Sequence, residues 1–107
     1  LPLPPGRFPG APYLEELIDG LVYDETWTRD QLSSRDRSLA TIAVTLAGYR
    51  SDQLRVHLRR GLDNGVTPQE ISELIAHVTL YSGFPTGVNA SRMFAEILRE
   101  RGMPLPN

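Results

Sequence analysis

Apolar residues recur along this chain at the spacing of an α-helix, and this periodicity limits the possible folds more than any other feature. Between residues 14 and 21, four apolar side chains follow the i, i+3, i+4, i+7 pattern that gathers them on one helix face. Comparable stripes occupy residues 39–46, 54–62, 71–78 and 90–98. No segment shows the strict alternation of apolar and polar residues that is typical of a β-strand. The sequence therefore predicts an all-α domain.

Helix-starting and helix-ending residues separate these stripes. The strongest signal combines Thr67 as N-cap, Pro68 at the first helical position and Glu70 at the position from which a carboxylate reaches back to the cap. The other expected boundaries are a capping box of Ser33 with Asp36, a cap at Ser51, and chain breaks at Asn64–Gly65, Gly83–Pro85 and Gly102.

Two of the predicted helices, near residues 34–48 and 51–63, are joined by a short turn. Such a short connection favours an antiparallel helix hairpin. We expect the helix over residues 67–82 to cover this hairpin.

The two ends of the chain differ in composition from its middle. Residues 1–12 hold five of the nine prolines, and proline fixes φ and lacks an N–H donor. We therefore expect an extended arm over residues 1–12, a helical domain over 13–102 and a tail over 103–107. Proline-rich ends of this kind either fray or pack on a neighbouring subunit.

Composition excludes several classes of function. The 107 residues carry a formal net charge of −2 without a basic patch, which argues against nucleic acid as a partner. No apolar run approaches a membrane span, and no signal-peptide pattern is present. The absence of cysteine excludes disulfides, thiolate metal sites and thiol catalysis. These features predict a cytoplasmic domain.

His57 is the first candidate for chemistry. If Leu54 and Leu58 mark the buried centre of their helix, His57 lies about 60° from it, at the border between core and solvent. Gln53 lies one turn before it and Arg50 two turns before it. A histidine in this position can act as a general acid or base near neutral pH, or can simply bond a backbone carbonyl.

Arg37 is the second candidate. It falls in the first turn of its predicted helix, where a cation is unfavourable against the helix dipole. That position is explained if Arg37 binds an anion, or if it pairs with a neighbouring acid such as Asp36. Arg50 has the same two interpretations, and it shares a helix face with His57.

Other polar and aromatic residues allow further roles. Glu73 and His77 form an i, i+4 pair that suits a salt bridge at a subunit interface, a catalytic role, or a metal site completed by His57. Four aromatic residues either shape a pocket or pack at helix junctions: Trp27, Tyr49, Tyr81 and Phe84.

Order and spacing of several motifs resemble those of the carboxymuconolactone decarboxylase family. The resemblance covers about residues 13 to 100, and it is carried by Leu32-Ser33-Ser34-Arg35-Asp36-Arg37-Ser38-Leu39, Arg55-Val56-His57-Leu58, Asp63-Asn64-Gly65-Val66-Thr67-Pro68-Gln69-Glu70 and Tyr81-Ser82-Gly83-Phe84-Pro85. It implies the alkylhydroperoxidase D-like fold, with about five to six helices and a central antiparallel hairpin. In the peroxidase branch of that fold, a cysteine pair and a glutamate occur at the positions of Arg50, Gln53 and Ser38, so this chain lacks the peroxidase groups.

The resemblance implies a cofactor-free, metal-free decarboxylase of 4-carboxymuconolactone that assembles as a trimer or hexamer. His57 would donate the proton, Arg37 would act with it, and Arg50, Gln53, Tyr81 and Trp27 would contact the substrate. The family often has a glutamate where this chain has Gln53, which raises the alternative of a different acid or lactone. A non-catalytic oligomeric binding domain is the alternative from another class.

Overall fold

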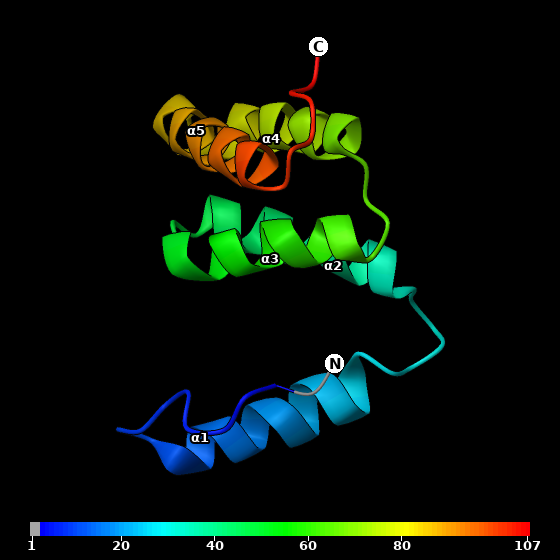
Figure 1. Ribbon diagram of the computed structural model, residues 1–107, viewed down its shortest axis with the longest axis vertical. Coiled ribbons are helices and arrows are strands. Elements are labelled where there is room, and N and C mark those ends of the chain that lie inside the picture. The colour runs from blue at the N-terminus through cyan, green and yellow to red at the C-terminus, as the bar shows by residue number, and fades with distance from the viewer. Residues whose placement is uncertain (1–2) are drawn as a thin grey trace. The chain divides into compact units, whose positions relative to one another are not determined.

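The computed structural model describes residues 3–107, and within them all regular structure is helical (Figure 1). This confirms the predicted all-α fold class. The elements in chain order are α1 (Pro12–Leu17), the π-helical segment η1 (Ile18–Thr26), α2 (Ser34–Ala47), α3 (Ser51–Asp63), α4 (Pro68–Ser82) and α5 (Phe84–Glu100). The chain divides into two compact units, the first ending at Ser34 and the second comprising Arg35–Asn107. The expected domain boundaries at residues 12 and 102 stay predictions.

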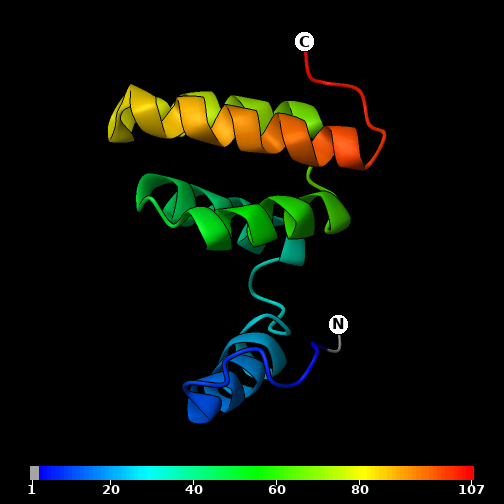
Figure 2. The ribbon, with the colours of Figure 1, turned by 60° about the vertical axis from the view of Figure 1, so that its left-hand side comes forward.

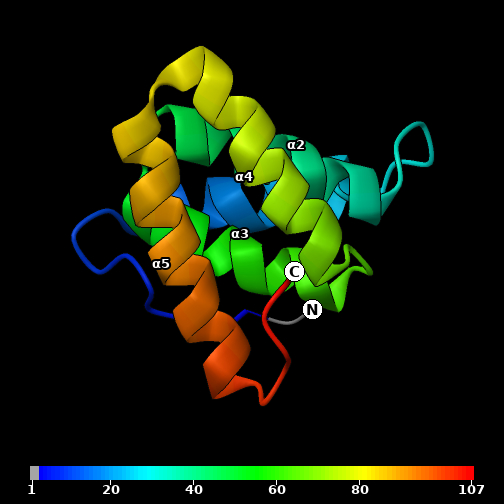
Figure 3. The same ribbon diagram turned by 90° about the horizontal axis from the view of Figure 1, so that it is seen from above.

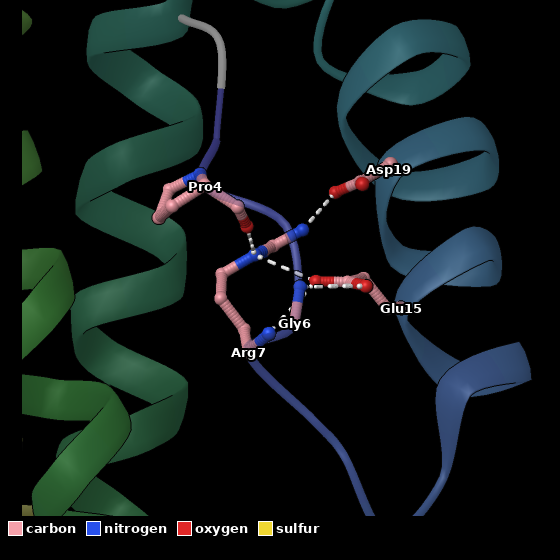
Figure 4. A network of polar contacts seen from close by, with 5 residues as sticks. All are labelled: Pro4, Gly6, Arg7, Glu15 and Asp19. Carbon is pink, nitrogen blue, oxygen red and sulfur yellow. Dashed lines mark hydrogen bonds and ion pairs between the residues drawn. The ribbon is translucent and has the colours of Figure 1, made fainter.

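The first unit contains α1, which continues directly into η1. The segment before α1 was expected to be extended. Its described residues instead contain turns, and Gly6 has a φ of 74°. Its backbone N–H groups at Gly6 and Arg7 donate to the Glu15 carboxylate, and the Arg7 guanidinium pairs with Glu15 and Asp19 (Figure 4). These contacts tie the segment to the helix, yet neither α1 nor η1 contains a buried residue.

In the second unit, α2 and α3 form one layer and α4 and α5 form another (Figures 1 and 2). The core between them consists of Ile42, Leu46, Leu54, Leu58, Val66, Ile71, Ile75, Ala90, Phe94, Ile97 and Leu98. The bounds of α2 and α3 confirm the expected hairpin, and Figure 3 shows the two helices side by side. The amide of Asn64, beyond the end of α3, donates to the Ser38 hydroxyl near the start of α2, so the helices are antiparallel.

The start of α4 confirms the predicted capping box. Thr67 accepts from the N–H of Glu70, and the Glu70 carboxylate accepts from the N–H of Thr67. That backbone hydrogen bond, followed by the contact with Arg35, lowers the pKa of the Glu70 carboxyl. Because Arg35 belongs to α2, the ion pair also connects the two layers.

The expected helix ends are confirmed at three glycines, and one expected cap is wrong. Gly65, Gly83 and Gly102 have φ angles of 95°, 110° and 65°, and each lies just beyond or between helices as predicted. Ser51, however, is the first residue of α3, and Arg50 occupies the N-cap position without a side-chain cap. The reason is the geometry of the preceding turn, which is described below.

Two glycines allow helices of the second unit to approach closely. A Cβ on Gly61 of α3 would lie 2.9 Å from the Ile42 Cδ1 of α2. A Cβ on Gly87 of α5 would lie 1.9 Å from the Thr79 Oγ1 of α4. Within the described residues, no helix is both long and apolar enough to cross a membrane.

Candidate functional site

His57 lies in the middle of α3, between the buried residues Leu54 and Leu58. Its side chain is half-buried, as the position on the helix predicted. Burial lowers the pKa of the His57 imidazole below its ordinary value of 6.5, because partial removal from water disfavours the charged form. In the unliganded protein the neutral imidazole is therefore favoured at neutral pH.

Arg50 and Gln53 precede His57 along the chain. Gln53 and His57 are one turn apart within the continuous helix Ser51–Asp63, and Arg50 is the residue before it. Both side chains are exposed. The rise of 1.5 Å per residue places Arg50 about 10 Å from His57 along the helix axis.

Arg37 lies in the first turn of α2 and is half-buried. The neighbouring residue Ser38 faces Gly61 of α3, where a Cβ would lie 3.9 Å from the Ser38 Cβ. Since Gly61 is four residues beyond His57, Arg37 lies at a level about 6 Å from His57 along α3. Along the axis of α3, His57 therefore lies between the position of Arg50 and the position next to Arg37.

The connection between α2 and α3 adopts a Schellman motif. The N–H of Arg50 donates to the Thr45 carbonyl at 2.9 Å, and the N–H of Tyr49 donates to the Leu46 carbonyl at 3.3 Å. Tyr49 takes the left-handed position with a φ of 57°, the only described non-glycine residue with a positive φ. A glycine usually occupies this position, because a Cβ there is strained.

A small cavity lies where α2 ends and where α3 and α5 begin. It has a volume of about 30 Å³ and is lined by Thr45, Leu46, Tyr49, Arg50, Ser51, Leu54, Thr86, Asn89, Ala90 and Met93. Thr45 uses its hydroxyl to donate within α2. Thr86 is 5% exposed, and its Oγ1 is a buried atom without a hydrogen-bond partner in the described structure.

A larger groove of about 780 Å³ runs between α4 and α5. Glu73, His77 and Arg92 line it together with apolar residues, including the exposed Leu80 and Phe84. Glu73 and His77 form no ion pair with each other in the described structure. No cluster of three or more metal-ligating side chains occurs among residues 3–107, so the arrangement of His57, His77 and Glu73 as a metal site is not supported.

The two aromatic candidates occur in different units of the chain. Tyr81 is 83% exposed at the end of α4, and its ring contacts that of His77 with 5.3 Å between centroids. Trp27 belongs to the first unit, where its ring lies 5.8 Å from that of Tyr23. A contact of either residue with a substrate stays a prediction.

Sequence reasoning missed Thr86 as a member of a site, whereas Tyr49 was named among the aromatic residues that could shape a pocket and does line the small cavity. Only the backbone shows that Tyr49 takes the left-handed position. Thr86 follows the Gly83–Pro85 break that was recognised, but its burial depends on how α5 packs against α2 and α3. No local signal in the sequence marks Thr86.

Comparison with known proteins identifies relatives over most of the chain. The model of the Carboxymuconolactone decarboxylase family matches residues 12–96. A 4-carboxymuconolactone decarboxylase of Acinetobacter baylyi is 43% identical over 89 residues, which are 83% of this chain and 66% of that protein.

Two other relatives are more distant. A nitrosuccinic acid decarboxylase of Metarhizium robertsii is 33% identical over 71% of this chain and 53% of its own length. An uncharacterised 15.0 kDa protein of Paracoccus denitrificans is 31% identical over 73% of this chain and 60% of its own length. The chain thus spans between about half and two thirds of the length of these relatives.

Proposed function

The chain belongs to the carboxymuconolactone decarboxylase family, and we propose that it is a cofactor-free decarboxylase of a small unsaturated lactone carboxylic acid. The proposed reaction converts 4-carboxymuconolactone into the β-ketoadipate enol-lactone. The observation that carries the proposal is a half-buried histidine on α3, at a level between those of two arginines. The name of the relative from Acinetobacter baylyi supports the choice of substrate.

The chemistry requires few protein groups, because the substrate accepts its own electrons. Cleavage of the bond between the γ-carbon and its carboxylate releases carbon dioxide, and the electron pair moves through the ring to the lactone carbonyl oxygen. A proton then adds to the α-carbon of the resulting dienolate. The protein therefore has to bind a dianion, stabilise the developing oxyanion and deliver one proton.

His57 is the proposed proton donor. Burial lowers its pKa in the free protein, but a bound dianion would raise that pKa again, because a nearby negative charge favours imidazolium. Substrate binding would thus load the imidazole with the proton that the dienolate takes up. Solvent would supply this proton again when the next substrate binds.

Arg37, Arg50 and Gln53 have supporting roles in this proposal. The two arginines supply positive charge on either side of His57 along α3, which suits a substrate with two carboxylates. Gln53, one turn before His57, would donate its amide N–H to the lactone carbonyl or ring oxygen. Tyr81 and Trp27 are proposed as further substrate contacts.

An ultraviolet assay with 4-carboxymuconolactone, coupled to detection of carbon dioxide, tests this function. We expect the intact protein to turn over, His57→Ala to fold but to lose most of kcat, and Arg37→Lys chiefly to raise KM. Circular dichroism provides the folding control for both variants. Full activity of His57→Ala would contradict the proposed mechanism.

A second candidate is the decarboxylation of a different acid. The relative named as a nitrosuccinic acid decarboxylase indicates that the family accepts other substrates, and Gln53 stands where a carboxylate is often found. A panel of lactone acids and substituted succinates separates the two candidates. A non-catalytic binding domain would show no turnover with any of them and no response to changes at His57, Arg37 or Arg50.

We also propose that the protein assembles as a trimer or hexamer and acts in the cytoplasm on a small carboxylate or lactone. The open groove between α4 and α5 supports self-association, because it exposes Leu80 and Phe84 beside Glu73 and Arg92. Glu73 and His77 would then serve in an interface. Nucleic acid and membrane are not expected as partners.

A further inference from the structure

The cavity at the start of α3 has features that the proposed reaction does not by itself require. Three helix ends converge on it, and its volume of about 30 Å³ accommodates roughly one water molecule or one carboxylate oxygen. Its lining is mixed, with apolar walls from Leu46, Leu54, Ala90 and Met93 and polar groups from the remaining residues. A cavity of this kind selects a small polar group rather than a hydrocarbon.

Thr86 is the first of three positive or donating groups at this cavity. It lies in the first turn of α5 and is 5% exposed. Its Oγ1 makes no hydrogen bond within the described structure. Leaving a buried hydroxyl without a partner costs stability, so an acceptor in the cavity would satisfy a group that the fold leaves unsatisfied.

The N-terminus of α3 is the second group. Arg50 occupies its N-cap position, and an arginine side chain has no acceptor with which to cap a helix. The N–H groups of the first turn and the positive end of the helix dipole are therefore available to an anion. Asp52 lies in this turn but does not line the cavity.

The guanidinium of Arg50 is the third group. Its Cγ and Nε lie 3.5 and 3.8 Å from the point where a Cβ on Gly48 would be, so the side chain packs over the glycine. Within residues 3–107 no carboxylate forms an ion pair with Arg50. The Schellman motif fixes the backbone of this residue through the bond to the Thr45 carbonyl, which holds the side chain at the edge of the cavity.

We infer that this cavity is a carboxylate subsite. One carboxylate oxygen enters the cavity and accepts from the Thr86 hydroxyl, and the other faces Arg50 and the first-turn amides of α3. Asn89 adds an amide at the rim. The subsite itself is independent of the proposed function, and only the identity of its natural ligand rests on that function. If the proposed reaction is correct, the carboxylate that the substrate retains would occupy this subsite while His57 acts on the ring.

Succinate is a suitable probe because it is a dicarboxylate that carries no lactone ring and cannot undergo the proposed reaction. We would titrate the full chain with succinate and follow backbone amide chemical shifts, with sodium chloride added at equal ionic strength as the control. We expect shifts at Ser51, Asp52, Gln53 and Thr86. Thr86→Val should weaken succinate binding about 3- to 10-fold, and Arg50→Gln should weaken it by more than that.

Matched variants separate binding from packing. Thr86→Ser keeps the hydroxyl and should retain most of the affinity, and Ser91→Ala, on the same helix but in the other groove, should change nothing. Thr86→Val should leave thermal stability unchanged or raise it, because the buried hydroxyl is removed. A Thr86→Val protein that binds succinate like the original chain would overturn the subsite.

The outcomes also distinguish this subsite from the proposed function. Turnover of the lactone without any succinate-dependent shift at α3 would reject the subsite and leave the reaction standing. Succinate binding that depends on Thr86, in a protein without lactone turnover, would support the subsite and reject the substrate. Equal shifts with succinate and sodium chloride would reduce the effect to ionic strength and reject the subsite.

Discussion

At the scale of single residues, the half-burial of His57 gives the imidazole two different environments during the proposed cycle. In the free protein, burial lowers its pKa below 6.5. In the complex, the dianion opposes this shift. The pKa of His57 is therefore higher in the complex, where the imidazole has to carry the proton, than in the free protein.

This difference predicts the pH dependence of the reaction. The value of kcat/KM reports the free protein, so it should fall as the pH rises through a pKa below 6.5. The value of kcat reports the complex and should persist to higher pH. Rate measurements between pH 5 and 9 would check this separation, and coincident pKa values in both profiles would contradict it.

The same lowered pKa affects stability with a definite sign. The unfolded chain binds the His57 proton below about pH 6.5, whereas the folded chain binds it only at lower pH. Stability should therefore decline as the pH falls through this window. Urea unfolding of the original chain and of His57→Gln should show a smaller decline in the variant.

Tyr49 illustrates a conflict between stability and binding. Its φ of 57° places a Cβ in the left-handed region, which costs roughly 1–2 kcal/mol. We expect Tyr49→Gly to raise the free energy of unfolding by about 1 kcal/mol, while succinate binding becomes weaker because Tyr49 lines the cavity. Thermal unfolding and the amide titration measure the two effects, and a variant that improves both would contradict the role of Tyr49.

At the scale of helices, the start of α4 and the ends of α3 and α5 could be predicted from sequence. The signals there are local: Thr67 with Glu70, and glycines at 65 and 102. The start of α3 at residue 51 was also predicted, but its cap was not, because the Schellman motif places Arg50 rather than Ser51 at the N-cap position. His57 was placed correctly at the core border, whereas the burial of Thr86 arises from contacts between helices distant in sequence.

The contact of α4 with α5 yields a prediction that contrasts two glycines. Gly87→Ala would bring a Cβ to 1.9 Å from the Thr79 Oγ1 and 3.0 Å from its Cβ, and the short, branched threonine cannot move aside. We expect a loss of about 1–3 kcal/mol. Gly61→Ala should cost less, because the atom that it meets is the terminal methyl of Ile42.

A second substitution checks the cause of the Gly87 effect. Thr79→Ala removes the clashing atoms, so the double variant Gly87→Ala with Thr79→Ala should be more stable than the sum of the two single effects predicts. Urea unfolding measures all three variants. Simple additivity would show that the helices do not meet at this contact.

At the scale of the whole molecule, the open groove between α4 and α5 bears on assembly. Leu80 is 72% exposed and Phe84 is 68% exposed, and large exposed apolar patches commonly mark protein interfaces. We expect Leu80→Glu to shift the protein toward the monomer. Light scattering after gel filtration measures this shift, with Leu105→Glu, at a less exposed residue that also lines the groove, as a milder comparison.

Three ion pairs between α3 and α5 have a consequence for how the helices align. Arg55 with Glu96 and Arg59 with Glu100 repeat every four residues, so sliding α5 by one turn could still satisfy one pair. The third pair has the opposite polarity, with Asp63 on α3 and Arg101 at the end of α5. A slip in one direction would bring Glu100 to Asp63, and a slip in the other would bring Arg101 to Arg59. Each exposed pair adds little stability, yet together they define a single register by making both neighbouring ones repulsive.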